Sequence, residues 1–278
     1  MSRLAVSTSL LALLFWSAAA SAQQSKTTPT ASATVAADSQ SAGQQLAQAE
    51  SAIAKSDWKG AQSILTAWIS TYPKDARGLF DAGYVADAQN HPREAESLYR
   101  RASQADPKSF EARISLGLLL AREGKLDEAR PELAAATTLD PGAAGPALKA
   151  RAWRALAQID RPGPNRGGDP AVASNDLLQA LKLSPETEDD TLLAASLAED
   201  TGQSDAAEAA YHRVLADDPG SEAASSGLAH ILIEQKQYPE AESILRAGLE
   251  KSPDNPALTA QLALALANQN DPKALPLV

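Results

Sequence analysis

The residues of this sequence with the most catalytic potential are its three histidines and one glycine-rich loop. His91, His212 and His230 lie far apart in the sequence and show none of the spacings with which histidines bind a metal ion. The loop Gly163–Gly168 lacks a preceding strand and the Lys-Ser/Thr pair of nucleotide-binding loops. We therefore expect ordinary surface or cap histidines and no phosphate site.

A carboxylate cluster at residues 186–190 is the next candidate. Glu186, Glu188, Asp189 and Asp190 lack the central glycine of a calcium-binding EF-hand loop, and we expect them to interact with the positive end of a following helix dipole. The sequence has no Gly-x-Ser-x-Gly motif and no cysteine, which excludes disulfides, thiolate ligands and cysteine nucleophiles. These observations predict no catalytic residues, no metal site and no cofactor, and therefore a protein that is not an enzyme.

The composition indicates helices and argues against polyanionic partners. Of the 278 residues, 44% are hydrophobic but only 4% are aromatic, so a buried core must be built from Ala and Leu. Such cores occur in closely packed helices, whereas β-sandwiches favour Val, Ile, Tyr and Phe. The formal net charge is −10, and nucleic acids and anionic lipid surfaces attract proteins with an excess of Lys and Arg. We therefore expect no nucleic-acid partner.

A repeat of 34 residues runs through most of the chain. Prolines recur at this spacing apart from one interval of 44 residues, an alanine precedes each proline by 12 residues, and a large apolar residue follows each alanine by 4 residues. A fixed period of this length is typical of solenoids. The prolines are Pro73, Pro107, Pro141, Pro185, Pro219 and Pro253, the alanines are Ala61, Ala95, Ala129, Ala173, Ala207 and Ala241, and the apolar residues are Leu65, Tyr99, Leu133, Leu177, Tyr211 and Leu245.

Each repeat is expected to form two helices, as residues 76–109 illustrate. Apolar and small residues at helical spacing predict a first helix over 76–89, and Asn90 follows at the step where a left-handed residue ends a helix. Pro92 suits the first turn of a second helix, which Asp106 ends because a residue before proline avoids the α conformation. In other repeats, the position equivalent to Asn90 is occupied by Gly124, Gly168 and Gly202.

These patterns resemble the tetratricopeptide repeat family, whose units carry apolar or small residues at fixed positions before a final proline. The resemblance implies an all-α fold, a right-handed α-solenoid of antiparallel helix pairs. We expect six complete repeats and a partial seventh, with boundaries at 42–75, 76–109, 110–143, about 150–187, 188–221 and 222–255. Two repeats illustrate the pattern, with Leu116, Gly117, Leu120, Ala129, Leu133, Ala136 and Pro141 in one and Trp153, Leu156, Ala157, Ala173, Leu177, Ala180 and Pro185 in the other.

Three features depart from the family pattern, of which one is a polar residue at position 4 of several repeats (Gln45, Arg113, Thr191 and Ser225). Trp68 stands at a position that is small in the family, so we expect the packing of the first repeat on the second to open locally. The fourth repeat has ten additional residues: 144–149 are expected to extend its first helix, and the Pro- and Gly-rich loop 160–170 is expected to be non-helical, as a hinge or an added contact surface. The predicted parts of the folded chain are 42–143, 144–187 and 188–278, the last with a helix at 256–269 that caps the solenoid or docks on another subunit.

The N-terminus has the features of an export signal. Arg3 precedes the apolar stretch Leu10–Trp16, and Ala20-Ser21-Ala22 matches a cleavage site, which predicts a signal peptide over 1–22 and a mature chain that starts at Gln23. The alternative is an uncleaved anchor, although the apolar stretch is short for a bilayer. We predict a flexible tether over 23–41, which is rich in Ser, Thr, Ala and Gln, and no membrane-spanning segment after it.

The resemblance also implies a binding groove, because the first helices of the family's repeats line a concave surface. Carried over position by position, it places Phe80, Tyr84, Ile114 and Leu118 in an apolar part of this groove. A basic band of Arg151, Arg154 and Arg161 follows, and Asp189, Glu199 and Asp200 belong to an acidic end. The alternative is that the aromatic residues pack within the solenoid and the arginines only keep it soluble.

The sequence therefore predicts a non-enzymatic scaffold that binds a protein partner in its groove. The export signal places this scaffold in the bacterial cell envelope, in the periplasm, or else secreted or associated with the outer membrane through its partner. The alternative function is a glycan-binding or accessory subunit in the assembly or export of envelope polysaccharide or peptidoglycan. The sequence specifies neither the identity of the partner nor the oligomeric state.

Overall fold

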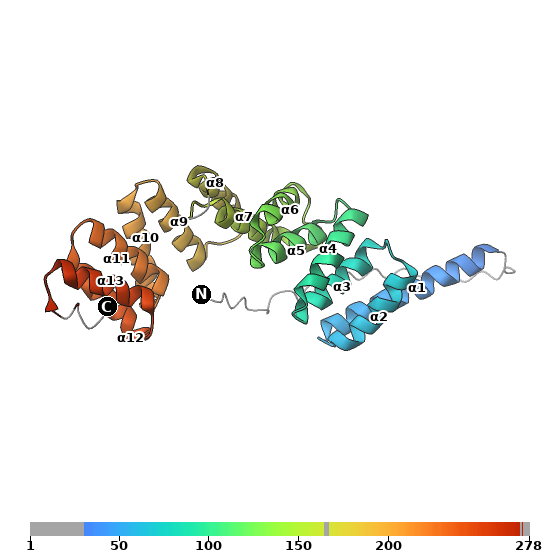
Figure 1. Ribbon diagram of the computed structural model, residues 1–278. Coiled ribbons are helices and arrows are strands. Elements are labelled where there is room, and N and C mark those ends of the chain that lie inside the picture. The colour runs from blue at the N-terminus through green and yellow to red at the C-terminus, as the bar shows by residue number, and fades with distance from the viewer. Residues whose placement is uncertain (1–30, 164–166, 273, 275–278) are drawn as a thin grey trace. The chain divides into compact units, whose positions relative to one another are not determined.

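The computed structural model describes residues 31–163, 167–272 and 274, and this part of the chain is built from thirteen α-helices and one 3-10 turn (Figure 1). The predicted all-α fold is confirmed, with two helices in each complete repeat. The helices are α1 (Ala31–Ala54), α2 (Trp58–Thr71), α3 (Ala76–Ala88), α4 (Pro92–Ala105), α5 (Phe110–Arg122), α6 (Leu126–Thr138), α7 (Gly145–Asp160), α8 (Pro170–Leu181), α9 (Glu188–Asp200), α10 (Ser204–Asp217), α11 (Glu222–Glu234), α12 (Tyr238–Lys251) and α13 (Pro256–Asn268).

Within each unit, most helices pack on the helices next to them in the chain. The two helices of a repeat lie against each other, as α3 does on α4, and the second helix also packs on the first helix of the next repeat, as α4 does on α5. This nearest-neighbour packing lets a solenoid bury apolar faces that no single repeat can cover alone.

Side-chain caps fix where several of the first helices begin. The carboxylate of Asp75 accepts a hydrogen bond of 2.6 Å from the Gly78 N–H, and the hydroxyl of Ser109 accepts one of 3.2 Å from the Ala112 N–H. Such caps satisfy N–H groups that a helix start leaves unpaired, and each contributes about 1 kcal/mol. They explain why α3 and α5 start within one residue of the predicted positions.

The turn between the two helices of a repeat contains a left-handed residue at a regular interval. The predicted left-handed conformation is observed at Asn90 (φ 60°), Gly124 (φ 75°) and Gly202 (φ 74°). The equivalent residue of three other turns is also left-handed: Ser56 (φ 57°), Lys236 (φ 61°) and Asn270 (φ 55°). Because Ser and Lys are not favoured there, the sequence did not reveal two of these turns.

The fourth repeat departs from this turn geometry. Gly168 is not left-handed, and it is needed for space instead, because a Cβ atom there would lie 2.5 Å from the carbonyl oxygen of Asp160. The predicted extension of the first helix is observed, since α7 starts at Gly145. The described residues of the loop before Pro170 are non-helical, as predicted.

Glycines on the first helices make room for bulky side chains of the second helices. A Cβ atom at Gly83 would lie 2.7 Å from the Tyr99 ring, and one at Gly117 would lie 2.6 Å from Leu133 Cγ. Gly78 does the same for Trp68, whose ring would lie 2.3 Å from such a Cβ atom. The prediction that Trp68 opens the packing is therefore wrong: its side chain is buried, because a glycine of the next repeat receives it.

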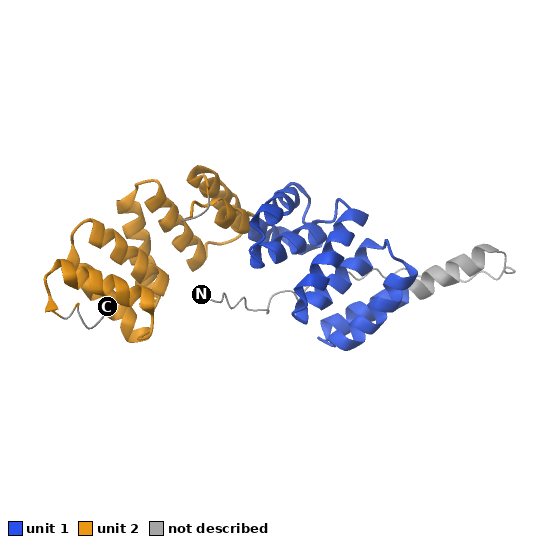
Figure 2. Ribbon diagram, viewed as in Figure 1, with its two compact units in different colours: residues 1–152 blue, residues 153–278 orange. Residues whose placement is uncertain are grey.

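The chain forms two compact units, residues 1–152 and 153–278, which divide within α7 (Figure 2). In unit 1, α1, α2 and α3 share a buried cluster that includes Leu46, Leu65 and Val85. In unit 2, a larger cluster extends from α9 to α13. Burial of one such leucine stabilises the fold by about 1.5–3 kcal/mol.

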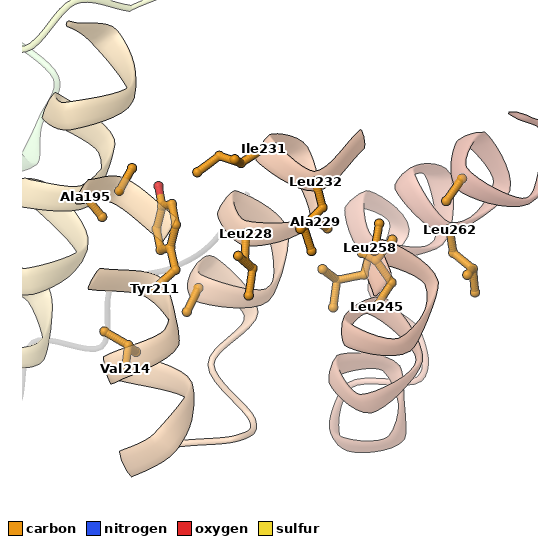
Figure 3. Close-up of a cluster of buried hydrophobic side chains, with 14 of the residues drawn as sticks. Ala195, Tyr211, Val214, Leu228, Ala229, Ile231, Leu232, Leu245, Leu258 and Leu262 are labelled. Carbon is orange, nitrogen blue, oxygen red and sulfur yellow. The ribbon is translucent and has the colours of Figure 1, made fainter. Parts of the chain in front are cut away.

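The predicted helix at 256–269 is observed as α13, and it is part of the unit 2 cluster. Figure 3 shows Tyr211 and Leu228 together with Leu245, Leu258 and Leu262 in this cluster. Leu258 and Leu262 are contributed by α13, which packs on both α11 and α12. This helix therefore covers apolar side chains at the end of repeat six.

The N-terminal predictions are only partly within the described residues. The signal peptide at 1–22 and residues 23–30 of the tether lie outside them. Residues 31–41 are helical and belong to α1, where the sequence predicts an irregular tether; their many alanines have the highest helix propensity. None of the helices in the described part of the chain has the length and apolar character needed to cross a bilayer.

Candidate functional site

Three of the predicted groove residues lie half-buried on the first helices of unit 1. Phe80 and Tyr84 are one turn apart on α3, and Leu118 is on α5. Half-buried aromatic and aliphatic side chains are typical anchors for a partner, because a second surface can still cover them. We refer to Phe80, Tyr84 and Leu118 as the groove residues of unit 1.

The prediction for Ile114 is wrong. Its side chain is only 1% exposed and is among the largest fully buried side chains of the protein. The helix α5 packs on both α4 and α6, and its buried residues cover more of its surface than a single stripe. Ile114 therefore belongs to the core and is not available to a partner.

The two aromatic groove residues also make contacts inside unit 1. The ring centroids of Tyr84 and Trp58 are 6.2 Å apart in an edge-to-face arrangement, and those of Phe80 and Tyr99 are 5.8 Å apart. Burial raises the pKa of Tyr84, and the carboxylate of Asp87 raises it further. The aromatic residues thus pack within the solenoid on one side and remain partly exposed on the other.

Ion pairs connect successive first helices of unit 1. Arg77 on α3 pairs with Glu50 on α1, and Arg122 on α5 pairs with Asp87 on α3. Asp87 is three residues after Tyr84, and Arg122 is four residues after Leu118, so each charge follows a groove residue by one turn on the same side of its helix. The apolar groove residues are therefore flanked by a charge pair.

Asp81 is a carboxylate on α3 that the sequence does not single out. Its Oδ2 atom is buried and receives no hydrogen bond from the described residues. Burial raises the pKa of Asp81 to about 7, the carboxylate of Glu50 adds to this effect, and Arg77 opposes it. Because burial outweighs the attraction of Arg77, the pKa of Asp81 lies near neutral pH.

Arg154, from the predicted basic band, is bound to a carboxylate of its own unit. Its Nε and Nη2 atoms donate hydrogen bonds of 2.7 Å each to the two carboxylate oxygens of Asp190. Burial raises the pKa of Asp190, but hydrogen bonds from Arg154 and Thr187 outweigh it and hold the pKa below its usual value. Asp190 also completes a capping box with Thr187 at the start of α9. Arg154 therefore joins α7 to α9.

The other two predicted arginines differ from Arg154. Arg161 Nε lies 3.5 Å from a carboxylate oxygen of Asp200, so this pair also joins the end of α7 to α9. Arg151 is exposed, and it belongs to unit 1. The three arginines thus do not form one equivalent band, because two of them have carboxylate partners in unit 2.

A pocket that the sequence does not indicate lies on a second helix of unit 1. It has a volume of about 440 Å³ and is lined by Arg93, Glu96, Ser97, Arg100, Arg101 and Gln104 of α4 and by Lys125. Residues 93, 97, 101 and 104 recur at helical spacing, which is a signal that could have revealed this face. We refer to these seven residues as the basic pocket.

Sequence profiles of the tetratricopeptide repeat match residues 80–144, 198–265 and 232–274, which together make up about half of the chain. The chain belongs to the tetratricopeptide repeat family. Tetratricopeptide repeats of this kind present their helix faces to protein partners, and the fold is that of a protein-interaction scaffold.

Solved structures of other tetratricopeptide repeat proteins share the fold. A tetratricopeptide repeat protein from Parabacteroides merdae ATCC 43184 superimposes with a TM-score of 0.61 at 16% identity, covering 84% of this chain and 89% of that one. YrrB, a tetratricopeptide repeat protein with an unusual peptide-binding site, superimposes with a TM-score of 0.56 at 17% identity, covering 74% of this chain and 97% of that one. At these identities the similarity concerns the fold alone.

A relative by sequence is the cellulose synthase 1 operon protein C of Komagataeibacter xylinus. It is 30% identical over 182 residues, which are 62% of this chain and 13% of that protein. This tetratricopeptide repeat protein therefore spans a small part of the length of its relative.

The histidines of this tetratricopeptide repeat protein lie near glutamates of their own helices. His91 Nδ1 is 3.8 Å from Glu94, and His230 Nε2 is 3.6 Å from Glu234. His212 is similarly close to Glu208. Within the described residues, no three His, Cys, Asp or Glu side chains are grouped so that they could hold a metal ion.

Proposed function

We propose that this protein is an interaction scaffold of the bacterial cell envelope that holds a segment of a partner protein against the first helices of unit 1. The observation that supports this function is the set of half-buried groove residues, Phe80, Tyr84 and Leu118, on neighbouring first helices of a tetratricopeptide repeat fold. The peptide-binding site of YrrB, which shares the fold, is in keeping with this mode.

Recognition combines apolar contact with charge. The groove residues provide apolar area that a partner buries, and burial is worth about 25 cal/mol per Å². The neighbouring Asp87–Arg122 ion pair places a negative and a positive charge beside the groove residues. These charges orient the partner segment, since charges at the edge of an interface contribute more to specificity than to affinity.

The envelope location rests on the N-terminal sequence. The basic residue, apolar stretch and Ala-x-Ala site at 1–22 have the order of a secretory signal. Export places the repeats in the periplasm, where a protein without cysteines folds without disulfides.

The groove is tested by photo-crosslinking in cells with a photoreactive amino acid at Tyr84, at Leu118, or at Thr138 as the control. Thr138 is exposed on a second helix of the same unit. We expect the same discrete protein adduct from positions 84 and 118 and none from position 138. Equal labelling at all three positions, or no adduct at 84 and 118, would contradict the proposed groove.

The second candidate is an accessory role in polysaccharide assembly or export. It is favoured by the relative from Komagataeibacter xylinus, which is named as a cellulose synthase operon protein. The aromatic rings of Phe80 and Tyr84 could stack on sugar rings, which have apolar faces.

Affinity electrophoresis in gels that contain neutral hydroxyethyl cellulose separates the two candidates. A glycan-binding groove predicts retarded migration that the Phe80→Ala, Tyr84→Ala double variant loses. Unretarded migration of the unmodified protein, together with a protein adduct at position 84, would leave the protein-binding function.

A further inference from the structure

The basic pocket on α4 concentrates positive charge in one cavity. Four cations, Arg93, Arg100, Arg101 and Lys125, line it together with a single carboxylate, Glu96. The whole chain, in contrast, has a formal net charge of −10.

Both oxygens of the pocket's carboxylate already accept hydrogen bonds from cations of the pocket. Glu96 accepts hydrogen bonds of 2.6 Å from both Arg100 and Lys125. The hydrogen bond from Lys125 has the largest effect and lowers the pKa of Glu96; burial opposes it, and the hydrogen bond from Arg100 adds to the lowering. Arg100 also donates a hydrogen bond of 2.9 Å to Glu128, so Arg100 and Lys125 are held in place rather than free to turn away.

The remaining donors of the pocket are available. Arg93, Ser97 and Gln104 have no side-chain partner among the residues that the structure describes, and Arg101 makes one long hydrogen bond of 3.3 Å to the Pro73 carbonyl oxygen. Residues 93 to 104 span about 16 Å along a helix at 1.5 Å per residue. This length corresponds to about five residues of an extended peptide.

We propose that the basic pocket binds a short acidic segment of a partner protein. Two or three carboxylates of an extended segment pair with Arg93 and Arg101, while Ser97 and Gln104 donate hydrogen bonds to its backbone. Carboxylates and guanidinium groups form paired hydrogen bonds of matching geometry. This site lies on a second helix and is separate from the groove residues on the first helices.

The charge of the rest of the chain favours a short segment over an extended polyanion. Salt limits the reach of a charge to about 8 Å at physiological ionic strength, so a segment of about five residues senses mainly the pocket. A membrane surface or a nucleic acid is much larger and also faces the acidic remainder of the molecule.

The test is fluorescence anisotropy of the full chain with two labelled peptides, one with about five consecutive glutamates and one with glutamines in their place. We expect the glutamate peptide to bind at low salt and the glutamine peptide not to bind. The Arg93→Gln, Arg101→Gln double variant should weaken binding about three- to tenfold, since exposed ion pairs are individually weak.

The matched control removes two positive charges elsewhere in unit 1. Lys55 and Lys108 are exposed and outside the pocket, and the Lys55→Gln, Lys108→Gln variant should change the affinity less than about twofold because its charges are not in contact with the peptide. Equal weakening in both double variants, or no binding of the glutamate peptide, would overturn the proposal.

Vesicles of phosphatidylglycerol and phosphatidylcholine form the last arm of the test. Sedimentation with these vesicles that depends on Arg93 and Arg101 would overturn the acidic peptide in favour of a lipid surface. Crosslinking from Tyr84 should be unchanged in the pocket variant, so that failure of this site and failure of the groove are distinguishable.

Discussion

Two buried carboxylates on first helices show how the partners of a side chain decide its behaviour. Asp190 receives hydrogen bonds from Arg154 and from the Thr187 N–H, and its pKa is held low. The Oδ2 atom of Asp81 receives none from the described residues, and burial raises its pKa to about 7. The first carboxylate stabilises the fold in its charged form, whereas the second is tolerated best when it is protonated.

Asp81 makes unit 1 less stable as the pH rises. Its pKa is about 7 in the folded chain against an ordinary value of 3.8, so between these values the folded state binds a proton that the unfolded state has lost. The free energy of unfolding therefore falls from pH 4 to pH 7 and is constant above. The Asp81→Asn variant should be about 4 kcal/mol more stable than the parent at pH 8 and similar to it at pH 4. Urea unfolding at the two pH values measures this, and an equal difference at both would contradict the account.

Lys236 occupies a left-handed turn position that suits glycine. Its φ of 61° is a left-handed backbone conformation, which costs about 1 kcal/mol or more for residues with a Cβ atom. We expect Lys236→Gly to raise the free energy of unfolding by about 1 kcal/mol and Gly202→Ala, at the same step of the preceding repeat, to lower it by a similar amount. Changes of the same sign in the two variants would show that backbone strain at this step is not what matters.

At the scale of helices, small residues determine how closely the two helices of a repeat approach. Gly83→Ala should lower the free energy of unfolding by about 1–3 kcal/mol, because the new methyl group would lie 2.7 Å from the buried ring of Tyr99. The control is Gly43→Ala in α1, where no atom lies within 4 Å of the added Cβ and the better helix propensity of alanine should stabilise by up to about 1 kcal/mol. Thermal unfolding compares the two, and a stabilised Gly83→Ala variant would refute the close approach.

Of the two charge pairs that join α7 to α9, Arg154–Asp190 contains the more buried carboxylate. Arg154→Met leaves Asp190, which is 2% exposed, without its guanidinium partner. We expect a loss of about 3 kcal/mol in the free energy of unfolding, part of which Asp190→Asn should restore in the double variant. Arg246→Met is the control, because Arg246 pairs with Glu242 on an exposed helix surface and such a pair is worth about 0.5 kcal/mol or less. Equal losses in the two single variants would contradict a structural role for Arg154.

At the scale of the whole chain, export predicts a defined new N-terminus. Cleavage after Ala22 gives a mature protein that starts at Gln23. Mass spectrometry of the protein from an envelope fraction should find this N-terminus, and Ala22→Phe should retain the uncleaved chain because the site accepts small residues. A mature protein that still begins at Met1 would support the uncleaved anchor instead.

The helices and their order followed from the sequence because each rests on local chemistry. Pro92 favours a helix start and Asp106 precedes a proline, and these preferences act within a few residues. The structure differs from these predictions where residues distant in the sequence come into contact. The side chain of Trp68 packs on Gly78 of the next repeat. Ile114 is buried in a helix that packs on both α4 and α6. A periodic pattern marks which residues are apolar but not how completely neighbours cover them.

The sequence by itself determined the all-α repeat, its period and most of the residues that end a helix, because these depend on backbone conformation and on spacing along one helix. Only the tertiary structure decided which polar residues find partners. The match of Arg154 with Asp190 and the buried Oδ2 of Asp81 depend on neighbouring helices, and in the basic pocket Lys125 joins three arginines of α4. Burial and charge act through space, and the distances that set them exist only when the helices are packed.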